Sequence, residues 1–204
     1  MVDDRVYRVG EVAVHPDAGA VAAAAGYPVG SSDTRMERTL RRAQGRYRVE
    51  LAYSRDSVVV SGERIEIGGH STLDSLSLSR FLRGCTGILL LASTLGARVS
   101  EDIERLGETG RMDEAHLLDA VASEMADEGL DVARRMAVRH LLNRGEMAAR
   151  RRFSPGYGDV DLGFQRVLFD RLRLGDLGMS ILPSCMLVPE KSVLAMVGIR
   201  RMMR

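Results

Sequence analysis

The chain has no tryptophan and few aromatic side chains of any kind, and this scarcity limits how its core is built. Phenylalanine, tyrosine and tryptophan make up 4% of the 204 residues, whereas 45% are hydrophobic and 28% are charged. These proportions are typical of a folded globular protein, in which aliphatic side chains and the 11 methionines must fill the interior. The length suits one well-buried core, and we expect a single domain over residues 1–204.

Cysteine and long apolar runs are also scarce. Cys85 and Cys185 form no CxxC pair, so the sequence predicts no disulfide framework and no cysteine metal site, and we expect both thiols to be buried as small hydrophobic side chains. No apolar run approaches the roughly 20 residues of a membrane span. The acidic N-terminus lacks the basic flank and apolar stretch of a signal peptide. We therefore expect a cytoplasmic protein without a membrane segment.

Charge is nearly balanced, and this argues against large anionic partners. The net charge of +1 provides no overall field for nucleic acid or an anionic membrane, and we expect neither as a partner. The arginine-rich run 134–152 is typical of a solvated helix face, with docking of an acidic electron donor or corrinoid protein as the alternative and nucleic-acid binding as a weaker one. The four histidines lack metal-ligand spacing, so no metal site is expected.

Periodicity predicts helices near the N-terminus and strands after them. Residues 16–26 and 32–46 have helical patterns, with Ser32 or Asp33 as the cap of the second helix. From residue 48 the period changes to two, which predicts three strands up to residue 69. Turns are expected between these strands, at Arg55–Asp56 and at Ser61–Gly62.

The rest of the chain alternates helices with apolar strands. Helical patterns occur at 71–84, 97–107, 112–142 and 164–175, and strand patterns occur at 87–94, 184–189 and 191–199. The run 87–94 is continuously aliphatic, so we expect a central, buried strand. Strands gathered early and late, with helices between them, favour an α+β fold. On the long helix, Glu124 falls on or beside the apolar stripe, where a carboxylate requires a partner.

The stretch RRFSPGYGDVDL, residues 151–162, has the composition of a ligand-binding loop. Gly156 and Gly158 permit unusual backbone angles and close approach of a ligand to backbone amides. The Arg152 guanidinium suits a carboxylate, and Tyr157 offers a ring and a hydroxyl. With Glu124 added, the set suits an amino acid that carries an adenosine.

Two other interpretations of this stretch are open. The spacing of Arg152, Gly156 and Tyr157 is equally compatible with a purely structural turn. Asp159 and Asp161 are candidates for an acid–base pair, although an exposed turn explains them as well.

Five segments taken in order resemble the activation (reactivation) domain of cobalamin-dependent methionine synthase, in particular its free-standing activation-domain-like proteins. They are FLRGCTGILLLASTLG, LLDAVASEMADE, RRFSPGYGD, FQRVLFDRL and CMLVPEKSVLAMVGI. The resemblance covers roughly residues 82–199, whereas residues 1–80 match more weakly. It implies a C-shaped α+β domain around a twisted, mainly antiparallel sheet flanked by helices.

The resemblance also implies that the chain binds S-adenosylmethionine. The residues that it assigns to the cofactor are Glu124, Arg152, Ser154, Pro155, Gly156 and Tyr157. In these roles, Arg152 engages the methionine carboxylate, the Gly156 region offers main-chain contacts, Tyr157 packs against the ligand and Glu124 accepts hydrogen bonds. No catalytic or metal-binding residue is implied. An N-terminal aspartate and a late tyrosine that also contact the ligand in the full synthase have no evident counterpart here.

In the family, the methyl group passes to cobalamin on a partner domain after one-electron reduction of cob(II)alamin. The chain lacks cobalamin-binding and synthesis regions, so the resemblance implies an accessory component that acts on a corrinoid-binding protein or on separate methionine synthase modules. A flavodoxin-like electron donor is a further candidate partner. The alternative is a non-catalytic scaffold subunit that has lost the cofactor; an enzyme unrelated to corrinoids has no specific support. The oligomeric state stays open.

Overall fold

The computed structural model describes residues 5–28 and 33–202. Its centre is a seven-stranded sheet of order β4-β3-β2-β5-β9-β6, in which β1 pairs with β2 beside this path and all pairs are antiparallel. The strands of this sheet are β1 (Val6–Val12), β2 (Val49–Ser61), β3 (Arg64–Ile67), β4 (Ser71–Asp74), β5 (Gly87–Thr94), β6 (Glu146–Ala148) and β9 (Ser192–Arg201). β7 (Ser180–Ile181) and β8 (Leu187–Val188) form a separate hairpin.

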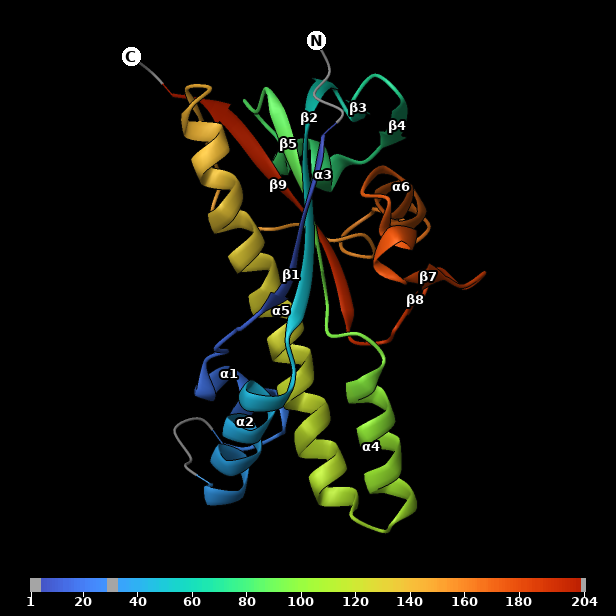
Figure 1. The fold of residues 1–204 in the computed structure, drawn as a ribbon. Coiled ribbons are helices and arrows are strands. Elements are labelled where there is room, and N and C mark those ends of the chain that lie inside the picture. Colours follow the sequence, from blue (N-terminus) through green and yellow to red (C-terminus); the bar gives the residue numbers. More distant parts are fainter. Residues whose placement is uncertain (1–4, 29–32, 203–204) are drawn as a thin grey trace.

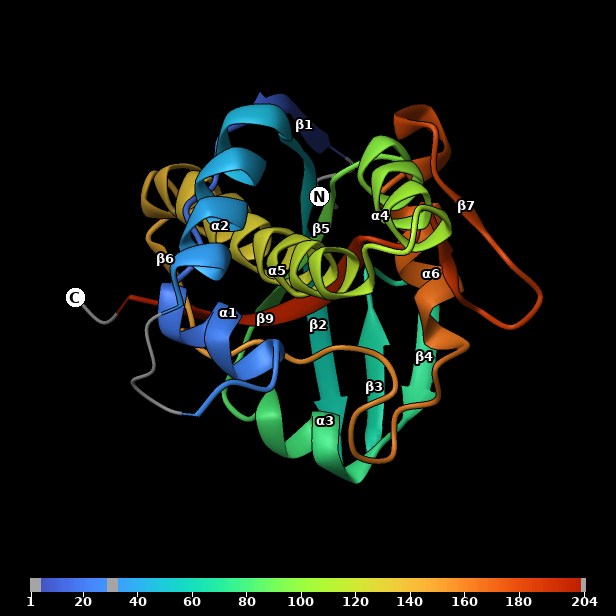
Figure 2. The same cartoon turned by 90° about the horizontal axis from the view of Figure 1, so that it is seen from below.

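Helices cover both faces of the sheet. They are α1 (Ala18–Ala24), α2 (Thr34–Arg46), α3 (Leu76–Phe81), α4 (Arg98–Glu108), α5 (Met112–Leu142), α6 (Phe164–Arg171) and the short 3-10 helix η1 (Leu174–Leu177). Figure 1 shows α5 running along the sheet, with α1, α2 and α4 around its first half. Seen from below, α1 and α2 lie on one side of α5 and α4 lies on the other (Figure 2).

Two hydrophobic cores are separated by the sheet, as the alternation of side chains along β5 shows. Leu89 and Leu91 belong to the core under α1, α2, α4 and α5, whereas Ile88 and Leu90 belong to the core under α3 and α6. Every residue of β5 is buried, which confirms the central strand expected from its aliphatic run. No helix in the described part of the chain is long and apolar enough to cross a membrane.

The turn predicted at Arg55–Asp56 is wrong, because β2 continues through both residues. Each of the two charged side chains has a partner from a distant part of the chain. Arg55 Nη2 donates to Glu146 Oε1 at 2.5 Å, and Asp56 Oδ2 accepts from Arg171 Nε at 2.9 Å. These ion pairs allow charged residues inside a strand, and the sequence alone does not reveal them. The turn at Ser61–Gly62 is confirmed, with Gly62 at a φ of 66°.

The bounds of the long helix and the cap of α2 agree with the sequence predictions, whereas the burial of the cysteines does not. α5 begins and ends at the predicted residues 112 and 142. Asp33 caps α2, since its Oδ1 accepts the N–H of Arg35 at 2.6 Å; the other candidate, Ser32, lies outside the described residues. Cys85 and Cys185 are half-buried, so the expectation of two fully buried thiols is wrong.

Candidate functional site

The loop that holds the predicted site is fixed to the last strand before it leaves the sheet. β6 pairs with the end of β9, and Phe153 then exchanges two backbone hydrogen bonds with Met196, at 2.9 and 2.7 Å. Because side chains alternate in extended chain, Arg152 and Phe153 point to opposite faces of the sheet. Phe153 packs against Phe81 in the core under α3, with ring centroids 5.5 Å apart. The backbone around Arg152 is therefore held in place.

Beyond Phe153 the chain closes a compact loop of its own. Gly156 N–H donates to Val160 O at 3.0 Å, and Tyr157 N–H donates to Ser154 O at 3.2 Å. Gly156 and Gly158 have φ values of 89° and 59°, in the left-handed region that favours glycine. These two glycines therefore have the unusual backbone angles that the sequence predicts.

Arg152 faces α5, where it meets two aspartates. Its Nη2 donates to Asp127 Oδ2 at 2.6 Å, its Nη1 donates to the Asp127 carbonyl at 2.8 Å, and Asp131 Oδ2 lies 3.9 Å away. The sequence motif does not disclose these partners. They join the loop to the middle of α5 and orient the guanidinium.

Glu124 lies one turn before Asp127 on α5 and is half-buried. Burial raises the pKa of its carboxyl; the charges of Asp127 and Asp17 add to this rise, and Arg152 opposes it. Within residues 5–28 and 33–202, the Glu124 carboxylate has no hydrogen-bond or ion-pair partner in the protein. The structure therefore brings Glu124 and Arg152 into one electrostatic neighbourhood and leaves the Glu124 oxygens available as acceptors.

Asp17 lies close enough to Glu124 to influence its charge, and the sequence alone does not predict this. It is the N-cap of α1, where its Oδ1 accepts the N–H of Ala20 at 2.9 Å, and its charge reaches Glu124. The helical pattern over residues 16–26 predicts the helix that Asp17 caps, but it gives no sign that Asp17 lies near Glu124. What the sequence does not show is that α1 packs beside α5.

The residues of the loop differ widely in their exposure to solvent. Pro155 is buried and Ser154 is half-buried, whereas Gly156 is exposed and 68% of Tyr157 is accessible to solvent. Pro155 and Ser154 therefore shape the loop, while the ring of Tyr157 is open for stacking. Among the described residues, no hydrogen bond joins Tyr157 to Glu124.

Asp159 anchors the far end of the loop. Its carboxylate accepts from Ser75 Oγ at 2.5 Å, from Leu76 N–H at 2.8 Å and from Ser77 N–H at 3.1 Å. These hydrogen bonds, above all the one from Ser75, lower the pKa of Asp159 well below its usual range. In Figure 2 the loop passes beside α3 at this point. Asp161 instead accepts the N–H of Gly163 at 2.6 Å. Both carboxylates thus have structural roles, which removes the support for an acid–base pair.

No protein-family model matches the chain, and no curated protein matches it. Among solved structures, it is similar to the crystal structure of the MetH reactivation domain bound to AdoHcy. The TM-score is 0.72 at 11% sequence identity, over 95% of this chain and 78% of that one. The chain has the reactivation-domain fold. The likeness confirms the predicted resemblance and the C-shaped α+β architecture, and its coverage extends well into the first eighty residues.

Proposed function

We propose that this chain binds S-adenosylmethionine beside α5, at Glu124 and the loop Arg152–Tyr157, and supports reductive methylation of cobalamin held by a separate corrinoid protein or split methionine synthase. The observation that carries the proposal is the fold shared with a reactivation domain that was crystallised with AdoHcy. The conformation of the loop and the free Glu124 carboxylate add to it.

The charges around Glu124 suit a cationic ligand. Asp17, Glu124 and Asp127 contribute three carboxylates and Arg152 contributes one guanidinium, so these four side chains have a net negative charge. S-adenosylmethionine carries an ammonium and a sulfonium against one carboxylate, whereas S-adenosylhomocysteine lacks the sulfonium charge. Opposite charges within a few ångströms stabilise each other, and more strongly in a partly buried site. We therefore expect the sulfonium form to bind more tightly.

Each site residue has a binding role in this proposal. Arg152 has five N–H donors, of which Asp127 takes two, so donors are left for the methionine carboxylate. Glu124 accepts from the ammonium or a ribose hydroxyl, and Gly156 exposes main chain at a position where a side chain would obstruct the ligand. The exposed ring of Tyr157 packs against the adenosine.

The cofactors supply the chemistry, and the chain positions one of them. The sulfonium provides the methyl group, and a flavodoxin-like protein provides the single electron that cob(II)alamin requires. Within the proposal the chain contributes no catalytic side chain; it orients the methyl donor toward a partner that carries the cobalt. We place this accessory activity in the cytoplasm.

The binding step can be tested by calorimetric titration with S-adenosylmethionine and S-adenosylhomocysteine. Tyr157→Ala is the most informative variant, because the ring is exposed and its loss should leave the fold intact. We expect Tyr157→Ala and Arg152→Gln to weaken binding at least tenfold, and Glu124→Gln to reduce the preference for the sulfonium form. The matched control is Arg151→Gln, an exposed neighbour with the same change of charge. Equal affinities in all variants, or no binding at millimolar ligand, would overturn the proposal.

A second candidate is a scaffold subunit that no longer binds the cofactor. The observation that favours it is that both Nη atoms of Arg152 already donate to Asp127. In this case the purified chain would form a complex with a corrinoid protein, yet neither S-adenosyl compound would change the melting temperature of the chain or of the complex.

A further inference from the structure

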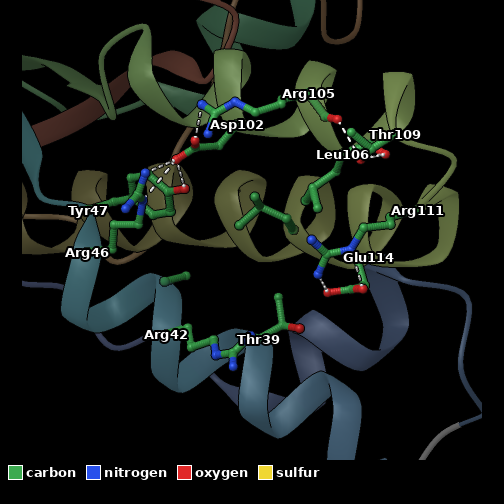
Figure 3. A pocket seen from close by; sticks show the side chains of 12 residues that line it. Thr39, Arg42, Arg46, Tyr47, Asp102, Arg105, Leu106, Thr109, Arg111 and Glu114 are labelled. Carbon is green, nitrogen blue, oxygen red and sulfur yellow. Dashed lines mark hydrogen bonds and ion pairs between the residues drawn. The ribbon is translucent and has the colours of Figure 1, made fainter.

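A cavity lies between α2, α4 and the start of α5, away from the loop Arg152–Tyr157. It has a volume of about 440 Å³, within the range of small-molecule sites. Figure 3 shows that α2 and α4 form opposite walls and that α5 lies behind. Ala43, Leu106 and Leu118 give the cavity an apolar lining. The remaining lining is dominated by arginine.

Two of the arginines in the cavity share one carboxylate. Asp102 Oδ2 accepts from Arg46 Nε at 2.9 Å and from the Tyr47 hydroxyl at 2.6 Å, and Asp102 Oδ1 accepts from Arg105 Nη2 at 2.6 Å. Burial acts to raise the pKa of Asp102, but the hydrogen bonds from Tyr47 and Arg46 outweigh it and lower the pKa. The carboxylate therefore stays ionised and holds this wall of the cavity in one geometry (Figure 3).

The other carboxylate of the cavity is also satisfied. Glu114 Oε2 accepts from Arg111 Nη2 at 2.5 Å. The lining thus has four guanidinium groups, those of Arg42, Arg46, Arg105 and Arg111, against the carboxylates of Asp102 and Glu114, which leaves a net charge of +2. Arg35 and Arg38 line an adjoining cavity that shares Arg42 and Arg111 with the first. The region is positive although the whole chain is almost neutral.

Arg42 is the arginine without a partner. In the described part of the chain its guanidinium makes no hydrogen bond and no ion pair. Its charge helps to lower the pKa of Glu114, but the Glu114 carboxylate is hydrogen-bonded to Arg111. Its five N–H donors are therefore open to a ligand. A guanidinium in this state matches the fork geometry of a phosphate or a carboxylate.

This cavity is distinct from the proposed S-adenosylmethionine site. Glu114 of the cavity and Glu124 of the proposed site are 10 positions apart on α5, which corresponds to about 15 Å along a helix that rises 1.5 Å per residue. The two regions also differ in sign, since carboxylates predominate around Glu124 and guanidinium groups predominate here. One ligand therefore does not satisfy both.

We propose that the cavity between α2, α4 and α5 binds a small organic anion, with a phosphate or carboxylate group at Arg42 and an apolar body against Leu106 and Leu118. The unpaired guanidinium provides the charge recognition, and the fixed network around Asp102 provides a preformed wall. The inference goes beyond the proposed function and does not depend on it.

Phenyl phosphate is a suitable probe, because it joins one phosphate to one apolar ring. We expect calorimetry to detect its binding, with weaker binding of inorganic phosphate and none of phenol. Arg42→Gln should reduce the affinity about tenfold or more, which is the loss of one charge-assisted contact. The control is Arg41→Gln on the same helix, which removes the same charge from an exposed side chain that pairs with Glu37 and does not line the cavity.

Three results would overturn the proposal. The first is an absence of heat with phenyl phosphate at millimolar concentration. The second is an equal loss of affinity in Arg41→Gln and Arg42→Gln, which would indicate general attraction to positive charge. The third is binding of phenol as tight as that of phenyl phosphate. Arg42 has no partner among the described residues, and Arg41 makes only a solvent-exposed ion pair with Glu37, which contributes little to stability. Both variants should therefore unfold at nearly the same urea concentration as the parent protein, so a loss of affinity is not an effect of unfolding.

Discussion

Replacement of Gly129 by alanine should destabilise the contact between α5 and the sheet. A Cβ atom at this position would overlap with Ser93 Oγ, and it would lie 2.9 Å from Ser93 Cβ and 3.3 Å from Leu51 Cδ2. Rotation of the serine hydroxyl would relieve only the first contact, so the helix or β5 must shift. Overpacking of this kind costs about 1–3 kcal/mol, and better helix propensity returns up to about 1 kcal/mol. We expect the free energy of unfolding to fall by about 1–2 kcal/mol.

Urea unfolding followed by circular dichroism measures this change. Gly45→Ala is the matched control, because Gly45 is also helical but a methyl group added there would have no atom within 4 Å, so this variant should be slightly more stable than the parent. Ser93→Ala removes the closest atom, which is also a buried hydroxyl without a hydrogen bond, so the double variant should be more stable than Gly129→Ala alone. A Gly129→Ala variant as stable as Gly45→Ala would refute the packing described for α5.

Three further substitutions test the electrostatics. Asp102→Asn should lower the free energy of unfolding by about 1–3 kcal/mol at pH 7. Because the folded-state pKa of Asp102 is lowered, the difference in stability between parent and variant, measured by urea unfolding, should shrink as the pH falls below the unperturbed 3.8. A difference that does not shrink there would contradict the assignment. Glu124→Gln should raise the melting temperature at pH 7, because the raised pKa of Glu124 means that its charged form destabilises the fold. This gain should vanish at a pH low enough to protonate Glu124 in the parent protein. A variant that melts at a lower temperature than the parent at pH 7 would contradict the raised pKa. Asp159→Asn should lower the urea midpoint, as loss of a helix cap does, and an unchanged midpoint would show that the loop is not anchored through α3.

Much of the fold follows from local patterns in the sequence. The aliphatic run of β5, the long amphipathic α5 and the cap at Asp33 were predicted, because burial on both faces, helical period and capping chemistry each leave a local trace. The continuity of β2 through Arg55 and Asp56 was not predicted. Its cause is the pairing of these residues with Glu146 and Arg171, at separations of 91 and 115 positions, and no local pattern encodes such contacts.

The candidate site was predictable in its loop but not in its surroundings. The glycines of the loop indicated their backbone conformation, whereas the ion pair of Arg152 with Asp127 and the nearness of Asp17 to Glu124 depend on how α1 and the loop pack on α5. The cavity beside Arg42 depends in the same way on the docking of α2 against α4 and α5. The sequence therefore predicts which residues are candidates for the site, whereas their neighbours depend on tertiary packing.

The central claim is that an S-adenosyl ligand binds beside α5 at the Arg152–Tyr157 loop. The most direct measurement is a titration of the isotope-labelled protein with S-adenosylmethionine, followed by backbone amide chemical shifts. The account predicts that the largest shifts occur at Gly156, Tyr157 and Glu124, with little change near Arg42. Saturable shifts confined to other parts of the chain, or no shifts at millimolar ligand, would contradict it.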